Sequence, residues 1–222
     1  MAQLEYVFHR VEDQREIAGL PTIRTLGPST TPQSPRVVGR PGGEMYVDTP
    51  VLVLPGIGNS GPQHWQTLWE LRHPDWQRVN LGDWDGPACD DWVRALDVAA
   101  QACPSPPVLV AHSLACLLVA HWAHRSALVP KGAFLVAVPD PQSASFPVTA
   151  RGFVPVPMAP FAFRSLVVAS ANDPLGSLAH AKHCAIAWGS TFVDIGQAGH
   201  INADSGHGEW NEGYTLLQRF MA

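Results

Sequence analysis

Short, continuous apolar runs recur along the chain from Val51 onward, and longer segments with apolar residues at helical spacing lie between them. The apolar runs predict strands at 51–54, 78–81, 108–111, 133–138, 166–169 and 191–195. The intervening segments predict helices at 64–71, 90–102, 114–124, 178–188 and 210–221. Strands that are apolar throughout and alternate with helices are typical of a parallel sheet with both faces covered. The pattern therefore predicts one α/β domain built on a mostly parallel sheet of about six strands, with helices on both faces.

The first 44 residues do not follow this pattern. Residues 28–43 are rich in Pro, Ser, Thr and Gly, a composition typical of a linker or a disordered segment. We expect residues 1–44 to be a flexible extension or an untranslated segment, because Met45 stands just before the first predicted strand and could be the start. Residues 45–222 form the predicted domain, which is too short for a separate cap domain. Only the segment 139–164, with its six prolines, could partly cover a site.

Composition and charge narrow the class of function. The 222 residues carry a net charge of −5 and no basic stripe, which disfavours nucleic-acid binding. No apolar run reaches the ~18 residues of a membrane helix. The four cysteines form no CxxC pair, so they indicate neither a zinc site nor a disulfide scaffold and fit a reducing cytoplasm. We expect a cytoplasmic protein without a nucleic-acid or membrane partner; the sequence indicates no particular oligomeric state.

A candidate nucleophile lies between the strand predicted at 108–111 and the helix that follows. The segment Ala111-His112-Ser113-Leu114-Ala115 has a small residue two places before and two places after Ser113, as in the nucleophile elbow G-x-S-x-G. Small residues suit this position because the strand and helix backbones approach closely at a sharp, strained turn. Taken alone, the pattern is as consistent with a serine that caps the helix.

Two further strand ends supply an acid and a base. Asp173 follows the next-to-last predicted strand, and His200 lies in a glycine-rich loop after the last one. The carboxyl ends of parallel strands meet at one edge of a sheet, where α/β proteins place their sites. Ser113, Asp173 and His200 also follow the chain order of α/β-hydrolases. Asp140 is an alternative acid. Asp173, before Pro174, is also compatible with a simple turn former, and His200 with a loop histidine that hydrogen-bonds to the backbone.

The loop after the first predicted strand resembles one half of an oxyanion hole. Residues 55–61 are Pro-Gly-Ile-Gly-Asn-Ser-Gly, and glycines allow a backbone to approach a substrate closely. We expect one N–H donor from Leu114, the residue after the nucleophile, and a second from Ile57, with Gly58 as the alternative. An ordinary glycine turn is the other interpretation of this loop.

Four segments together resemble the small serine hydrolases of the retinoblastoma-binding-protein-nine/YdeN type, in the α/β-hydrolase superfamily. They are residues 55–65 with His64-Trp65, the elbow around Ser113, residues 170–177 with Asn172-Asp173-Pro174, and residues 199–210 with Gly199-His200. The resemblance implies an α/β-hydrolase-type fold, with Ser113 as nucleophile, Asp173 as acid and His200 as base. The chain departs from the family at Ala111 and Ala115, where glycines are usual.

These features together predict a serine hydrolase that cleaves small acyl esters through an acyl-enzyme, with no metal and no organic cofactor. The residues expected to form a substrate pocket are Gly58, Asn59, His64 and Trp65, with Trp84 as a further candidate. The sequence does not distinguish ester, thioester and amide substrates. The alternative is a protein-binding module that keeps the fold with little or no turnover, and the complete order of the three residues argues against it.

Overall fold

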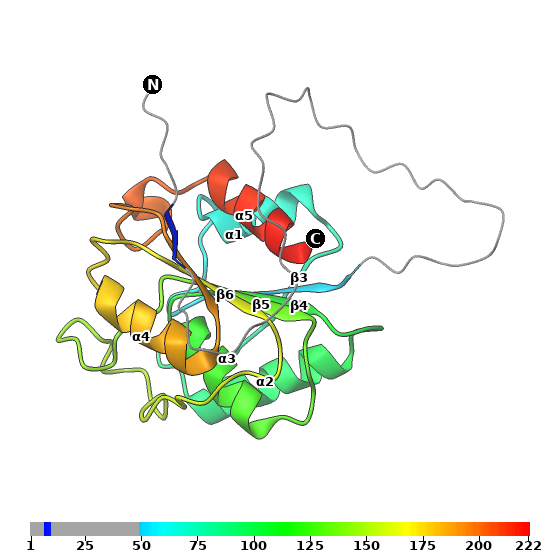
Figure 1. Ribbon diagram of the computed structural model, residues 1–222. Helices are drawn as coiled ribbons and strands as arrows, with labels where there is room; N and C mark the ends of the chain where they lie inside the picture. The colour runs from blue at the N-terminus through cyan, green and yellow to red at the C-terminus, as the bar shows by residue number, and fades with distance from the viewer. Residues whose placement is uncertain (1–6, 10–48) are drawn as a thin grey trace, which may run out of the picture. The chain divides into compact units, whose positions relative to one another are not determined.

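The computed structural model describes residues 7–9 and 49–222, which contain a seven-stranded sheet in the order β1-β7-β6-β5-β4-β2-β3 (Figure 1). The strands are β1 (Val7–His9), β2 (Val51–Leu54), β3 (Gln77–Arg78), β4 (Val108–His112), β5 (Gly132–Val136), β6 (Ser165–Ala169) and β7 (Thr191–Asp194). The neighbours from β7 to β3 pair in parallel, whereas β1 pairs antiparallel with β7. The prediction of an α/β domain on a mostly parallel sheet is confirmed.

In the described residues, five α-helices cover the two faces of the sheet. They are α1 (Trp65–Arg72), α2 (Cys89–Gln101), α3 (Leu114–Arg125), α4 (Leu178–Trp188) and α5 (Asn211–Met221), and a short 3-10 helix, η1, spans Ala203–Ser205. Helices α2, α3 and α4 pack on one face, and α1 and α5 pack on the other (Figure 1). No helix in the described ranges is both long enough and apolar enough to cross a bilayer.

Strand β4 shows why the central strands are apolar throughout. Leu109 and Ala111 belong to the core beneath α2, α3 and α4, whereas Val108 and Val110 belong to the core beneath α1 and α5. Successive side chains of a strand point to opposite faces, so a sheet with two covered faces buries every residue. All five residues of β4 are buried accordingly.

Two strands differ from the sequence-based expectation. The strand expected at 78–81 is only Gln77–Arg78, because Val79 and Leu81 are buried in the core without continuing a named strand. Strand β1 lies within the segment that we expected to be an extension. The remainder of residues 1–44, and Met45, lie outside the described residues, so the predictions made for them stay predictions.

The long segment between β5 and β6 packs against helices. Arg151 forms an isolated parallel bridge with Ala88, just before α2. The fully buried ring of Phe153 lies edge-on to Trp92 of α2, and Phe161 stacks on Trp188 of α4. These contacts hold the segment to the helical layer formed by α2, α3 and α4.

Candidate active site

Ser113 occupies a strained turn between β4 and α3. Its backbone has φ 56° and ψ −125°, in a region that residues other than glycine rarely adopt. Although Ser113 is the residue before the first turn of α3, its side chain makes no capping hydrogen bond, so the interpretation of a helix-capping serine is wrong. Ala111 and Ala115 are fully buried on either side of the turn. The methyl groups that replace the expected glycines are therefore accommodated.

The side chains of Ser113, His200 and Asp173 form a continuous hydrogen-bonded chain. Ser113 Oγ lies 2.9 Å from His200 Nε2, and His200 Nδ1 lies 2.9 Å from each carboxylate oxygen of Asp173. A carboxylate can only accept here, so the Nδ1–H donates to it and leaves Nε2 free to accept from the serine hydroxyl. Asp173 is additionally held by the Leu175 N–H, which donates to Oδ1 at 2.9 Å. The structure thus brings together the three residues that the sequence singled out.

The alternative acid, Asp140, lies beside the acid loop, where its N–H donates to the Leu175 carbonyl at 2.8 Å, but its carboxylate binds another histidine. Its carboxylate is 3.6 Å from His180 Nδ1 and also accepts a hydrogen bond from the Gln142 N–H at 2.9 Å. The only carboxylate bonded to His200 in the described residues is that of Asp173.

The two expected oxyanion donors lie on adjoining segments. An ideal Cβ built on Gly56 would lie 2.8 Å from Ser113 Cβ and 3.4 Å from the Leu114 nitrogen, so the loop backbone touches the elbow. Within residues 49–222, neither the Ile57 N–H nor the Leu114 N–H has a protein acceptor. The Gly58 N–H, in contrast, donates to the Trp84 carbonyl at 2.8 Å. Gly58 is therefore engaged elsewhere, and the pair Leu114 and Ile57 is left as the expectation.

Arg78 holds the glycine-rich loop from the side of β3. One terminal nitrogen, Nη1, donates to Asn59 Oδ1 at 3.0 Å and to the Ser60 carbonyl at 2.9 Å. The other N–H groups of its guanidinium donate to Glu70 and Thr67 on α1. All five N–H groups of the arginine are therefore in use, and the loop is tied to both a strand and a helix.

Gln66 also holds this loop, through buried hydrogen bonds. Its Nε2 donates to the carbonyls of Leu54 and Val110 at 3.1 Å each, and its Oε1 accepts from the Ser60 hydroxyl at 2.6 Å. Neither Arg78 nor Gln66 is predicted by the sequence, because neither belongs to a motif and their partners lie on other elements.

The residues expected to form a substrate pocket separate into two groups. Gly58 and Asn59 lie at the surface with positive φ, and Trp84 is half-buried against the core. Trp65 is fully buried, and its indole N–H donates to the Ile201 carbonyl at 2.9 Å. His64 is also buried, to about the same degree as Ser113, and the assignment of His64 and Trp65 to a substrate pocket stays a prediction. Apolar packing against the Trp69 and Trp210 rings explains the position of Trp65.

Three imidazole rings, those of His64, His112 and His200, follow one another beside Ser113. The centroids of His64 and His112 are 4.7 Å apart, and those of His112 and His200 are 5.0 Å apart. Burial lowers the pKa of His112 well below its usual range. Burial, Arg78 and His200 together lower the pKa of His64 to about 4. Both buried rings are therefore neutral near pH 7.

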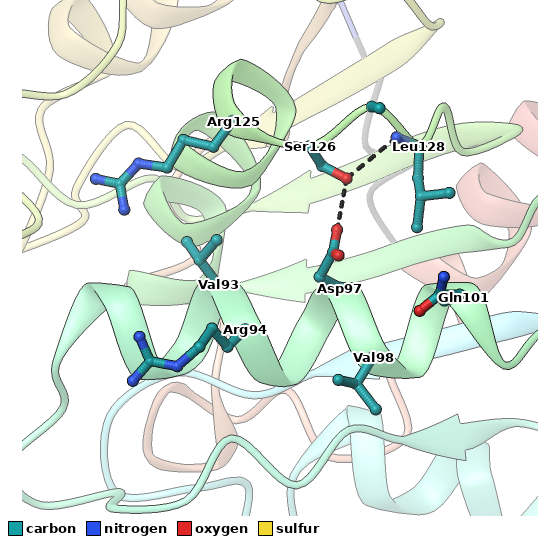
Figure 2. A pocket seen from close by; sticks show the side chains of 9 residues that line it. Val93, Arg94, Asp97, Val98, Gln101, Arg125, Ser126 and Leu128 are labelled. Atoms are coloured by element: carbon teal, nitrogen blue, oxygen red, sulfur yellow. Dashed lines mark hydrogen bonds between the residues drawn. The ribbon is translucent and has the colours of Figure 1, made fainter.

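A surface cavity of about 480 Å³ lies away from these residues, between α2 and the end of α3 (Figure 2). Its lining includes Asp97, which accepts hydrogen bonds from Ser126 and Trp122. Ser113, Asp173 and His200 are not among the residues that line it. In the part of the chain that the structure describes, no three His, Cys, Asp or Glu side chains gather as metal ligands would.

Comparisons with known proteins agree with this geometry. Residues 51–219 match a family model described as serine hydrolase. A YdeN-like hydrolase from Pectobacterium atrosepticum is 34% identical over 78% of this chain and 90% of its own, with a TM-score of 0.69. The ydeN gene product of B. subtilis is 20% identical over 78% of this chain and 98% of its own (TM-score 0.66). An esterase from Thermogutta terrifontis is 14% identical over 78% and 89% (TM-score 0.60). The similarity to the B. subtilis protein and to the esterase shows a shared fold. A comparison with curated proteins found no match to this chain.

Proposed function

Because the chain belongs to the serine hydrolase family and to its YdeN-like type, we propose that it cleaves small acyl esters through an acyl-enzyme on Ser113. The observation that carries this proposal is the unbroken hydrogen-bonded chain from Ser113 through His200 to Asp173. It combines a nucleophile at the carboxyl end of a strand, a base within reach of its proton and a carboxylate that orients the base. The esterase activity named for the Thermogutta terrifontis protein supports an ester as the substrate class.

Acylation begins when the Ser113 hydroxyl attacks the carbonyl carbon of the ester. His200 Nε2 takes the hydroxyl proton, and Asp173 stabilises the imidazolium through the Nδ1–H. The imidazolium then gives its proton to the departing alcohol, which leaves the acyl group on Ser113. Water attacks this acyl-enzyme with His200 again as base, and releases the acid. Every step uses side chains of this chain and water.

Charge builds up on the carbonyl oxygen in both steps. The Leu114 and Ile57 N–H groups, which lack a protein acceptor in the described residues, support our assignment of the oxyanion hole to them. Each such donor contributes about 3–4 kcal/mol of transition-state stabilisation in comparable sites. Arg78 and Gln66 hold the loop in place before substrate binds, so little reorganisation is needed during the reaction.

The location of the protein is part of the same proposal. Its four cysteines, Cys89, Cys103, Cys116 and Cys184, are free thiols. Free thiols are typical of a reducing compartment, which supports a cytoplasmic enzyme.

The test is labelling of purified protein with a fluorophosphonate probe, together with hydrolysis of p-nitrophenyl acetate. Ser113→Ala should lose both labelling and hydrolysis, whereas Ser145→Ala, at an exposed loop serine, should keep both. A panel of ester, thioester and amide substrates of increasing acyl length then defines the preferred class. A wild-type protein that neither reacts with the probe nor turns over any of these substrates contradicts the proposal and favours a binding module.

A further inference from the structure

The turn that carries His200 has an unusual backbone. Gly199 has φ 58° and the next residue but one, Ile201, has φ 48°. A positive φ is a genuine outlier for a β-branched residue and is unfavourable, so it persists only where surrounding contacts enforce it. The position of the base therefore depends on contacts that hold this turn.

One set of contacts reaches the turn from the acid loop. The Ser170 hydroxyl oxygen accepts from the Ala198 N–H at 2.9 Å, and Asn172 Oδ1 accepts from the Gly199 N–H at 2.7 Å. These bonds hold the two residues just before His200. They leave the carbonyls of His200 and Ile201 to other partners.

Two buried ring N–H groups bind these consecutive carbonyls. His112 Nε2 lies 3.0 Å from the His200 carbonyl oxygen, and Trp65 Nε1 donates to the Ile201 carbonyl at 2.9 Å. A carbonyl oxygen can only accept, so His112 carries its hydrogen on Nε2. The His112 and Trp65 rings also pack edge-to-face, with centroids 5.9 Å apart and an interplanar angle of 86°. The two donors come from β4 and α1 and reinforce each other.

We propose that His112 and Trp65 are positioning residues of the reaction, which fix His200 by binding the carbonyls of His200 and Ile201. The inference rests on the proposed role of His200 as the base. Neither side chain hydrogen-bonds to Ser113 Oγ or His200 Nε2 in the described residues, and each acts through the backbone of the turn. Without them the turn can relax from its left-handed conformation, which moves His200 Nε2 relative to Ser113 Oγ. A displacement of about 1 Å between reacting groups can cost about 100-fold in rate.

The chain offers a matched control for each residue. His121 is a second buried histidine, and its Nε2 lies 3.0 Å from the Phe153 carbonyl, outside the site. Trp188 is a second fully buried tryptophan, and its Nε1 donates to the Pro157 carbonyl at 2.9 Å. Substitutions at the controls remove the same type of hydrogen bond at comparable burial. They therefore separate a loss of positioning from a loss of stability.

The experiment compares His112→Leu with His121→Leu, and Trp65→Phe with Trp188→Phe, on p-nitrophenyl acetate hydrolysis. We expect His112→Leu and Trp65→Phe to lower kcat by about 10- to 100-fold with little change in KM, and the controls to stay within about threefold. His112→Gln, whose amide N–H replaces Nε2–H, should recover most of kcat. The downfield proton signal of the His200–Asp173 hydrogen bond should weaken only in His112→Leu and Trp65→Phe. Urea unfolding of all five variants reports their stability.

The outcomes separate this inference from the proposed function. If Ser113→Ala keeps the activity, the proposed function is wrong and the inference falls with it. If Ser113→Ala is inactive but His112→Leu and Trp65→Phe match their controls in kcat, the function stands and the positioning roles are wrong. Should His112→Leu fail to fold, the conservative pair Trp65→Phe and Trp188→Phe still decides the question.

Discussion

Replacing Gly56 with alanine should impair catalysis through lack of space alone. The added Cβ would lie 2.8 Å from Ser113 Cβ and 3.1 Å from the His112 carbonyl oxygen. Carbon atoms in ordinary contact are ~3.5 Å apart, so the loop and the elbow must separate by about 0.7 Å. Since about 1 Å of misplacement costs about 100-fold, we expect kcat to fall by about 10- to 100-fold. Overpacking of this kind also lowers the free energy of unfolding by about 1–3 kcal/mol.

Gly61 in the same loop provides the control. An ideal Cβ on Gly61 meets no heavy atom within 4 Å. Gly61→Ala should therefore keep both kcat and the urea midpoint close to those of the wild type. The assays are p-nitrophenyl acetate kinetics and the rate of fluorophosphonate labelling, each on protein shown by urea unfolding to be folded. Equal kcat values for Gly56→Ala and Gly61→Ala would refute the argument that the loop backbone sets the geometry of the nucleophile.

Asp173→Asn should lower kcat by about 10⁴-fold, because the amide no longer favours the Nδ1–H tautomer of His200. The kcat of Asp140→Asn should stay within about threefold of the wild-type value. The reverse order of hydrolysis rates would make Asp140 the acid. The free energy of unfolding should fall as the pH drops from 6.5 toward about 4, by up to about 1.4 kcal/mol per pH unit. The reason is that His64 binds a proton in this range when the protein is unfolded, whereas folding lowers its pKa to about 4 and keeps it neutral. Urea unfolding at pH 4.5 and pH 7 should show a smaller acid loss in His64→Gln, and an equal loss would be evidence against this linkage. Arg78→Lys keeps the charge without the planar fork, so kcat should fall by about tenfold at nearly constant KM; an unchanged kcat would show that the loop does not need this support.

The predicted fold follows the structure wherever a strand is buried on both faces. The runs at 51–54 and 166–169 coincide with β2 and β6 to within one residue, because two covered faces leave no polar position in the strand. The apolar run at 78–81 predicts a longer strand than β3, which ends at Arg78. Val79 and Leu81 are apolar because they are buried in the core, although they lie outside the strand. Strand β1 has three residues, which are too few to show the alternation of apolar and polar positions, so its pairing with β7 has no signal in the sequence.

The site is predictable to the extent that it depends on strand ends. Ser113, Asp173 and His200 each follow a strand of one parallel sheet, so chain order and topology bring them together. The supports of the site have no such signature. His112 contacts the His200 backbone across 88 residues of sequence, and Trp65 contacts Ile201 across 136. Their partners are carbonyl oxygens, which every residue carries, so no residue type along the chain marks the contact.

The same geometry explains why two further histidines can lie next to His200, the proposed base, without opposing its charge. In the proposed mechanism His200 becomes positively charged during acylation, and a second charge on His112, whose ring centroid lies 5.0 Å from that of His200, would raise the barrier by repulsion. Burial lowers the pKa of His112 and of His64, so both rings stay neutral while His200 is charged. A neutral His112 still has one N–H, which it donates to the His200 carbonyl. In the proposed mechanism, burial thus lets His112 hold His200 through the His200 backbone without placing a positive charge beside the His200 imidazole.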